Sequence, residues 1–231
     1  MRIGIIGAGN IGGALARRFS ELGHEVSIAN SRGPDSLREV EQETGATAVT
    51  AHEAARDKDV VVVTVPERNV SRLPVDLFDG VGADVVVVDT GNYYPRQRDG
   101  AIREIEEGMP ESVWVARQLG RPVVKAFNNI YAHHLRDRGR PAGSPGRIAL
   151  PVAGDDQVAK STVMALVEEL GFDAVDAGGL EDSWRQQPGT PVYAADFDAE
   201  GVRRGLAEAP RERPSEFRAT PISPGTFTDP V

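Results

Sequence analysis

The sequence predicts an α/β protein in which a mostly parallel sheet carries helices on both faces, the doubly wound arrangement. Three observations lead to this prediction: a glycine-rich turn directly after the first apolar run, a series of short valine- and isoleucine-rich runs, and helical patterns between those runs. Near-continuous apolar runs suit strands that are buried on both faces of a parallel sheet. Their alternation with helical segments is typical of strand–helix–strand units with right-handed crossovers.

The elements of the first half follow from these runs and from apolar residues that recur at helical spacing. In order, the sequence predicts a strand at Ile3–Ile6, a helix at Ile11–Leu22, a strand at Glu25–Ala29, a helix at Asp35–Thr44, a strand at Thr47–Thr50, strands at Asp59–Val65 and Asp84–Asp89, a helical or irregular stretch at Ala101–Leu119, and a strand at Pro122–Phe127.

A smaller α/β unit is expected after a loop rich in Arg, Gly and Pro at Arg136–Gly146. Two short strands, Ile148–Ala153 and Phe172–Asp176, flank a helix at Asp155–Leu170 whose first residues, Asp155 and Asp156, suit a helix N-terminus. This unit is too small to be assigned as a separate domain, so we expect it to pack on the main sheet or to extend it.

The glycine-rich turn reads Gly7-Ala8-Gly9-Asn10-Ile11-Gly12, which matches the GxGxxG fingerprint of dinucleotide-binding Rossmann domains. It follows a strand and opens a helix, as the fingerprint requires. Gly7 permits the tight turn, Gly9 lets the backbone approach a pyrophosphate, and Gly12 lets the helix pack against the strand. The free N–H groups and the positive dipole end of the helix would meet the phosphates.

The end of the second strand predicts NADP(H) rather than NAD(H). An NAD site usually places an acidic residue there, on the 2′-hydroxyl of the ribose. This chain has Asn30, Ser31 and Arg32 instead. An arginine fork can bind a 2′-phosphate through two hydrogen bonds, and the two shorter side chains can add weaker ones.

Other polar or turn-forming residues follow the later strands, where open α/β sheets bind their ligands. They include Thr64-Val65-Pro66, Thr90-Gly91-Asn92 and Asn128-Asn129. The predicted cofactor contacts are Gly7, Gly9, Asn10, Ile11, Gly12, Asn30, Ser31, Arg32, Val65, Pro66 and Asn92.

Three parts are therefore expected along the chain. Residues 1–146 form the NADP-binding Rossmann domain, and residues 147–209 form the small unit that completes the active-site cleft. Residues 210–231 hold five prolines and little periodicity, which predicts either a disordered tail or an extended arm on a partner subunit.

Composition narrows the classes of partner. The net charge of −9 argues against nucleic acid, and no apolar run is long enough to cross a bilayer. The chain has no cysteine, and the adjacent pair His133 and His134 would point in different directions, so no metal site is predicted. No signal peptide is recognisable at the N-terminus, so we expect a cytoplasmic protein.

Three stretches resemble the family of coenzyme F420-dependent NADP oxidoreductases. The first is the turn within residues 3–12 together with Ser31-Arg32, the second is Val152-Ala153-Gly154-Asp155-Asp156 with the helix that follows, and the third is residues 172–180. The resemblance implies direct hydride transfer between C4 of the nicotinamide of NADP(H) and C5 of a deazaflavin, coenzyme F420, in a homodimer. Such a transfer needs no nucleophile and no metal.

The chain departs from this family on the side of the second substrate. Trp184–Pro191 has no clear counterpart there, so Trp184 and Arg185 are candidates for stacking on a flat ring and for meeting an anionic substrate. The segment Asn92-Tyr93-Tyr94-Pro95 also differs from that family, and Tyr93 and Tyr94 are candidate aromatic walls or proton donors.

Two alternatives stay open beside a deazaflavin or flavin-like acceptor. One is a reductase of a small carbonyl or imine, with Tyr93, Tyr94 or His133 as the proton donor. The other is a non-enzymatic NADP(H) sensor whose tail contacts a partner.

Overall fold

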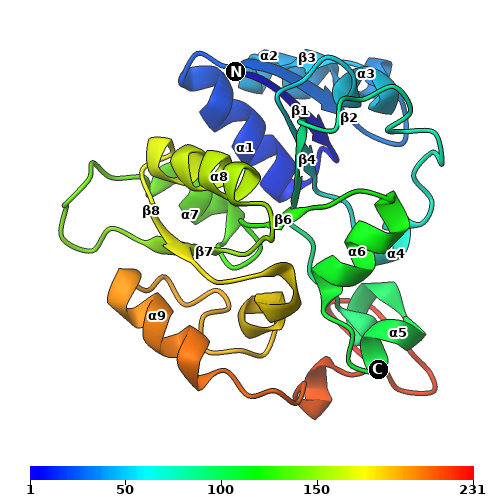
Figure 1. The fold of residues 1–231 in the computed structure, drawn as a ribbon. Helices are drawn as coiled ribbons and strands as arrows, with labels where there is room; N and C mark the ends of the chain where they lie inside the picture. Colours follow the sequence, from blue (N-terminus) through cyan, green and yellow to red (C-terminus); the bar gives the residue numbers. More distant parts are fainter.

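A computed structural model describes residues 1–231 (Figure 1) and contains one six-stranded, wholly parallel sheet. The strand order is β3-β2-β1-β4-β5-β6. From the central strand β1, the chain adds β2 and β3 towards one edge of the sheet, and then β4, β5 and β6 towards the other edge. This order confirms the predicted doubly wound Rossmann fold. The strands are β1 (Arg2–Ile6), β2 (Glu25–Ala29), β3 (Thr47–Ala48), β4 (Val60–Val63), β5 (Val86–Asp89) and β6 (Val124–Lys125).

Side chains that alternate along the strands divide the helices into two layers. Ile3, Ile5 and Val62 point to one face, where α1 (Asn10–Glu21), α2 (Arg38–Thr44), α7 (Ala132–Asp137) and α8 (Gln157–Glu169) lie. Ile6, Val61 and Val63 point to the other face, which α3 (Ala51–Ala55), the segment before β5 and α6 (Glu111–Leu119) cover. Every residue of β4 and β5 is buried, as expected for strands covered on both faces.

Several predicted boundaries differ from the structure for local reasons. The helix expected at Asp35–Thr44 begins as a 3₁₀ turn, η1 (Pro34–Leu37), before α2. The stretch Ala101–Leu119 is divided into α5 (Arg103–Glu106) and α6, because Gly108 adopts a positive φ of 105° and Pro110 follows it.

Other elements were not predicted or extend into predicted loops. The helix α7 ends inside the loop expected from Arg136, and α9 (Ala199–Glu208) was not predicted. The remaining elements are α4 (Glu67–Val70), the π-helical turn η2 (Pro95–Asp99), and the 3₁₀ turns η3 (Leu180–Gln186) and η4 (Ser215–Phe217). No helix of the structure has the length and apolar character needed to cross a membrane.

The smaller unit extends the main sheet through a single residue pair. Its strands β7 (Ala149–Val152) and β8 (Asp173–Asp176) are parallel to each other, with α8 between them. Lys125 and Ala153 exchange two backbone hydrogen bonds, of 2.8 and 3.0 Å, in an antiparallel bridge. The Asp156 side chain accepts hydrogen bonds from two N–H groups of the first turn of α8, which is the predicted N-cap.

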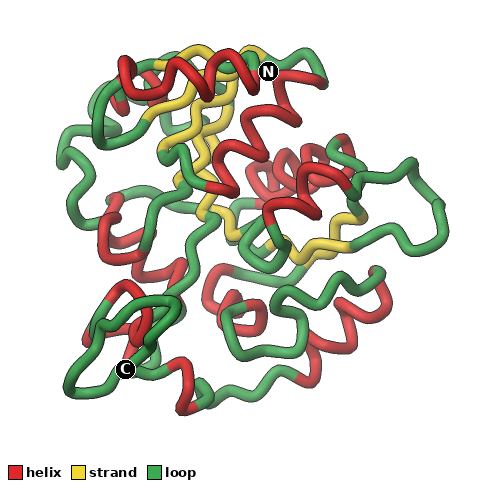
Figure 2. Tube along the Cα trace, turned by 180° about the vertical axis from the view of Figure 1, so that it is seen from behind, coloured by secondary structure: helices red, strands yellow, loops and turns green.

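Residues 210–231, which we call the C-terminal arm, lie beside α5 of the same chain (Figure 1) and are loop apart from the short helical turn η4 (Figure 2). Arg213 donates to the buried carboxylate of Glu111 at 2.7 Å. Arg96 in η2 donates to two backbone carbonyls of the arm at 2.8 and 2.9 Å. Glu106 accepts a hydrogen bond from the backbone N–H of Ala219 at 2.8 Å. The arm is therefore extended, and it is anchored by charged groups.

Replacing Arg213 by methionine should destabilise the fold by about 3 kcal/mol, because breaking a buried pair leaves an uncompensated charge. The Glu111 side chain is 0% exposed, and loss of Arg213 would remove the cation with which it forms a direct ion pair. Urea unfolding of the two proteins measures the difference. The matched control is Arg103→Met, because Arg103 and Glu107 form an exposed pair at 3.8 Å and its loss should change the unfolding free energy by less than about 0.5 kcal/mol. Equal losses in the two variants would contradict the anchoring role of Arg213.

Candidate functional site

The glycine turn after β1 is pressed against the residue that follows β4. Gly7 has a φ of 119°, and a Cβ there would collide with the carbonyl group of Thr64. A Cβ on Gly12 would collide with the Gly7 carbonyl and come within 2.8 Å of Thr64 Cγ2. Gly9 differs, because nothing lies within 4 Å of the position of its Cβ and the residue is exposed. The turn is therefore closely packed where Gly7 and Gly12 face Thr64, and its backbone is open to solvent at Gly9. We call it the locked glycine turn.

The N-terminus of α1 is free to bind an anion. The N-cap residue Gly9 offers no side chain to the first N–H groups of the helix, whereas α3, α8 and α9 begin with capping side chains of Thr50, Asp156 and Asp198. The first N–H groups of a helix have no intrahelical partner, and they lie at the positive end of its dipole. A diphosphate fits this end of α1, beside the exposed Asn10 and the half-buried Ile11.

The end of β2 presents a free arginine, and Asn30 stabilises the turn that carries it. Its side chain accepts from the backbone N–H of Arg32 at 2.9 Å and donates to Ser36 Oγ at 2.9 Å. Asn30 therefore holds the turn with its side-chain oxygen and one amide hydrogen, and its contact with the nucleotide stays a prediction. Ser31 and Arg32 are exposed, and the Arg32 guanidinium has no hydrogen bond or ion pair within the chain.

A buried ion pair lies at the carboxyl ends of β5 and β6. Lys125 Nζ lies 3.1 Å from Asp89 Oδ2 and donates to the carbonyl of Gly91 at 2.6 Å. Ser112 Oγ donates to the same carboxylate at 2.6 Å. Burial lowers the pKa of Lys125, but the carboxyl groups of Asp89, Glu67 and Glu111 together outweigh burial, so the pKa is raised. Lys125 is therefore a fixed positive charge that shapes this edge.

Amide side chains tie the loops after β5 and β6 to η3. Asn92 donates to the carbonyl of Asn128 at 2.8 Å, and Asn128 donates back to Asn92 Oδ1 at 3.1 Å. Gln186, within the unusual stretch Trp184–Pro191, donates to Asn128 Oδ1 at 3.0 Å. Phe127, just before this network, has a φ of 61°, a strained conformation for a bulky residue. The predicted contact residue Asn92 is thus held at the carboxyl edge of the sheet, where Val65 and Pro66 also lie, half-buried after β4.

Tyr93 is buried, which contradicts its predicted role as a wall or proton donor. The residue has 0% exposure, and its hydroxyl donates to the carbonyl of Gly100 at 2.9 Å. The same oxygen accepts from the N–H of Ile102 at 2.9 Å and lies 3.0 Å from a carboxyl oxygen of Glu106. Burial raises the pKa of Tyr93 well above its ordinary value. The side chain therefore supports the loop between β5 and α6 and has no free surface for a substrate.

Tyr94 is half-buried and meets Tyr193, a residue that the sequence analysis missed. The two hydroxyl groups are hydrogen-bonded to each other, and Arg98 lies 5.2 Å from the centre of the Tyr94 ring. Burial raises the pKa of Tyr193 to about 12. The only signal in the sequence was its place two residues after Trp184–Pro191, and the contact itself joins residues 99 positions apart.

Trp184 contacts Arg185 and the C-terminal arm. The guanidinium groups of Arg185 and Arg211 lie 4.7 and 4.8 Å from the centre of the indole ring. Trp184 borders a cavity of about 300 Å³ between α5, η3 and the arm, and no residue of the glycine turn lines this cavity. The structure therefore does not bring these two candidates to the nucleotide turn.

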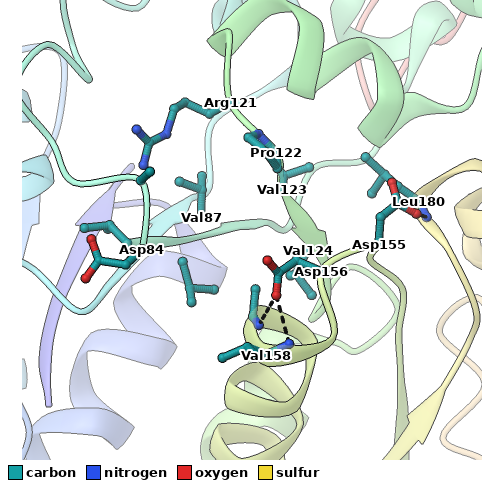
Figure 3. A pocket seen from close by; sticks show the side chains of 14 residues that line it. Asp84, Val87, Arg121, Pro122, Val123, Val124, Asp155, Asp156, Val158 and Leu180 are labelled. Carbon is teal, nitrogen blue, oxygen red and sulfur yellow. Dashed lines mark hydrogen bonds between the residues drawn. The ribbon is translucent and has the colours of Figure 1, made fainter.

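The exposed His133, at the start of α7, does lie beside that turn. It shares a cavity of about 440 Å³ with Gly9, Asn10, Arg17 and Arg136. Another cavity, of about 290 Å³, opens at the beginnings of β5 and β6 beside the start of α8 (Figure 3). Its lining is mainly apolar, with Arg121 and Asp155 among the polar residues, and it lies away from the carboxyl ends of the strands.

Comparison with known proteins gives a family and several relatives. Residues 2–93 match the model of the family described as NADP oxidoreductase, coenzyme F420-dependent. The hypothetical protein SMa0349 of Sinorhizobium meliloti is 34% identical, with a TM-score of 0.70 over 84% of this chain and 93% of that one. A protein of Arthrobacter sp. FB24, named for a proposed F420-dependent NADP reductase activity, is 23% identical, with a TM-score of 0.63 over 78% of this chain and 86% of that one, which shows a shared fold.

A further relative matches a smaller share of the chain. The protein YjhV of Escherichia coli strain K12 is 44% identical over 99 residues, which are 43% of this chain and 63% of that protein.

Two adjacent glycines of α1 provide a matched test of the locked turn. Gly12→Ala should destabilise the protein by about 2 kcal/mol or more, because the added methyl group meets backbone atoms that cannot yield. Gly13→Ala should leave stability unchanged or raise it by up to about 1 kcal/mol, because nothing lies within 4 Å and alanine favours the helix. Urea unfolding of both variants checks this. A stable Gly12→Ala protein would show that the turn does not depend on this close approach.

Proposed function

This chain belongs to the family of NADP oxidoreductases described as coenzyme F420-dependent, and from that premise we propose that it transfers hydride between NADP(H) and a second substrate. The observation that carries the proposal is the locked glycine turn at an uncapped helix N-terminus, with the free guanidinium of Arg32 at the end of the neighbouring strand. Diphosphate at the first feature and 2′-phosphate at the second are what NADP(H) requires.

The nicotinamide supplies the redox chemistry when it is bound, so the chain needs no nucleophile of its own. In this proposal the N–H groups of α1 bind the diphosphate, and Arg32 selects the 2′-phosphate. The loops after β4 and β5, with Pro66 and Asn92, position the ring at the carboxyl edge of the sheet. Buried polar groups behind this edge hold those loops still, which supports catalysis by positioning.

The second substrate that we propose is the deazaflavin coenzyme F420 or a flavin-like acceptor. The family description supports this choice, and hydride transfer between two flat rings requires only that their faces be held together.

One observation favours a different acceptor, a small carbonyl or imine. The hydroxyl groups of Tyr94 and Tyr193 are paired on half-buried side chains from two separate loops, and a phenol can donate the proton that follows hydride transfer to a carbonyl.

The direct experiment is oxidation of NADPH by the purified protein, followed by the loss of NADPH absorbance. Oxidised coenzyme F420, FMN, riboflavin and a panel of small carbonyls and imines are supplied as separate acceptors. Turnover with coenzyme F420 well above the others supports the deazaflavin proposal. Turnover with a carbonyl or imine that Tyr193→Phe abolishes supports the second acceptor. No turnover with any acceptor, although NADPH binds tightly, would contradict the proposed hydride transfer to these acceptors.

Selection of NADP(H) should depend on Arg32. Arg32→Ala is expected to weaken NADPH binding roughly 10-fold or more, because a hydrogen bond to a charged group is worth about 1.5–3 kcal/mol, and to leave NADH binding nearly unchanged. Fluorescence titration of both nucleotides measures this, and Arg56→Ala, at an exposed arginine after α3, serves as the control. Equal losses for NADPH and NADH would remove Arg32 as the 2′-phosphate ligand.

A further inference from the structure

Glu67 is an enclosed carboxyl group for which the chain supplies no hydrogen-bond donor. It follows Val65 and Pro66 directly after β4, and its residue exposure is 0%. Neither carboxyl oxygen has a hydrogen-bond partner. Buried polar groups of native proteins are almost always paired, so an unpaired carboxyl group at a ligand-binding edge calls for an explanation.

The carboxyl group of Glu67 lies close to the ion pair of Asp89 and Lys125. A Cβ on Gly91 would come within 2.5 Å of Glu67 Oε1 and 3.0 Å of Asp89 Oδ1, so both carboxyl groups border the same side of Gly91. Lys125 donates to the carbonyl of Gly91 on the same segment. Two acidic groups and one ammonium group are therefore buried side by side behind the carboxyl edge of the sheet.

Every other acidic group near Glu67 has its own donors. Asp89 receives hydrogen bonds from Lys125, Ser112 and the N–H of Gly91. In the same way, Glu111 on α6 receives them from Arg213 and the N–H of Tyr93, and Asp99 of η2 receives them from Arg98 and the N–H of Tyr94. On the same short helix as Glu67, Arg68 turns its guanidinium to the carbonyl of Arg98.

Lys125 is the nearby cation, but its ammonium group is bound to Asp89 and to the carbonyl of Gly91 and makes no hydrogen bond to Glu67, so burial favours the neutral acid. An ionised carboxylate without donors would bear the full cost of desolvation. Burial, and next the negative charge of Asp89, raise the pKa of Glu67 well above its ordinary range. Glu67 thus holds a proton that an exposed glutamate would have lost.

The position of this proton matters because the nearby ligand changes its charge. In the proposed function, the nicotinamide lies at the carboxyl ends of β4 and β5, next to the loop that carries Glu67. The oxidised ring bears one positive charge and the reduced ring bears none. A positive charge near a buried acid favours its ionised form, whereas a neutral ring does not.

We propose that Glu67 is a proton site linked to the redox state of the bound nicotinamide, an inference that rests on the proposed function. The group keeps its proton beside the reduced ring and releases it to solvent when the oxidised ring occupies the same place. No bond to the substrate forms and no electron moves at Glu67. It is a positioning residue, because its charge sets which form of the nucleotide is held more tightly.

The sign of the pH effect follows from this linkage. The pKa of Glu67 should be higher in the NADPH complex than in the NADP⁺ complex. Between these two values the NADPH complex binds up to one more proton, so rising pH favours NADP⁺. The ratio of the dissociation constants, NADP⁺ over NADPH, should fall by up to about 10-fold per pH unit in that window. Titration of the 2′-phosphate largely cancels from the ratio, because both nucleotides carry that group.

The test is isothermal titration calorimetry of NADP⁺ and NADPH between pH 6 and pH 9, in two buffers that differ in protonation enthalpy. The wild-type protein should release up to one proton more with NADP⁺ than with NADPH, and the ratio should depend on pH. Glu67→Gln keeps the shape but cannot ionise, so its ratio should be flat while both nucleotides still bind. Glu104→Gln, at an exposed acid on α5, should behave like the wild type.

A ratio that is flat in the wild type, or that still varies with pH in Glu67→Gln, overturns this inference and leaves the proposed function standing. Failure of the wild type to bind either nucleotide overturns both. If Glu67→Gln does not fold, infrared difference spectra of the wild type decide the matter. Loss of a protonated-carboxyl band on exchange of NADPH for NADP⁺ supports the proposal, and an unchanged band overturns it.

Discussion

The carboxyl edge of the sheet depends on Lys125, which joins three parts of the chain. Its backbone forms the antiparallel bridge to Ala153 that connects the smaller β7–β8 sheet to the main one. Its ammonium group neutralises Asp89 and holds the carbonyl of Gly91. An enclosed lysine is costly unless it is paired and fully hydrogen-bonded, so these contacts fix one another. The loop after β5 and the smaller unit are therefore positioned by the same residue.

The rest of the candidate site is assembled from pairwise constraints of the same kind. Gly12 lies so close to Thr64 and to the Gly7 carbonyl that only a residue without a side chain fits there. Asn128 bridges the loop after β5 to η3, so these two segments are held together at the carboxyl edge of the sheet. The C-terminal arm adds Arg213 to this edge from outside the sheet. The first turn of α1 and the guanidinium of Arg32 stay free to bind phosphate groups.

Local patterns in the sequence were sufficient for the sheet and the nucleotide turn, because apolar runs and glycine spacing report directly on strands and close backbone approach. The N-cap at Asp156 was predictable for the same reason. The roles of Asn30 and Tyr93 were not, because each depends on hydrogen bonds to partners that the fold brings close. Glu67 gave no signal, since a glutamate after a proline is an ordinary helix start. Only the complete burial of its side chain, without a hydrogen-bond donor, makes it unusual.

We propose that NADP(H) binds along the carboxyl edge of this sheet, from the end of β2 to the loop after β5. A crystal structure of the protein with NADPH would show where the nucleotide lies. We expect the diphosphate at the turn from Gly7 to Gly12, the 2′-phosphate on Arg32, and the nicotinamide between the loops that carry Pro66 and Asn92. A nucleotide bound elsewhere, such as in the cavity at the beginnings of β5 and β6, or a ribose phosphate without contact to Arg32, would contradict it.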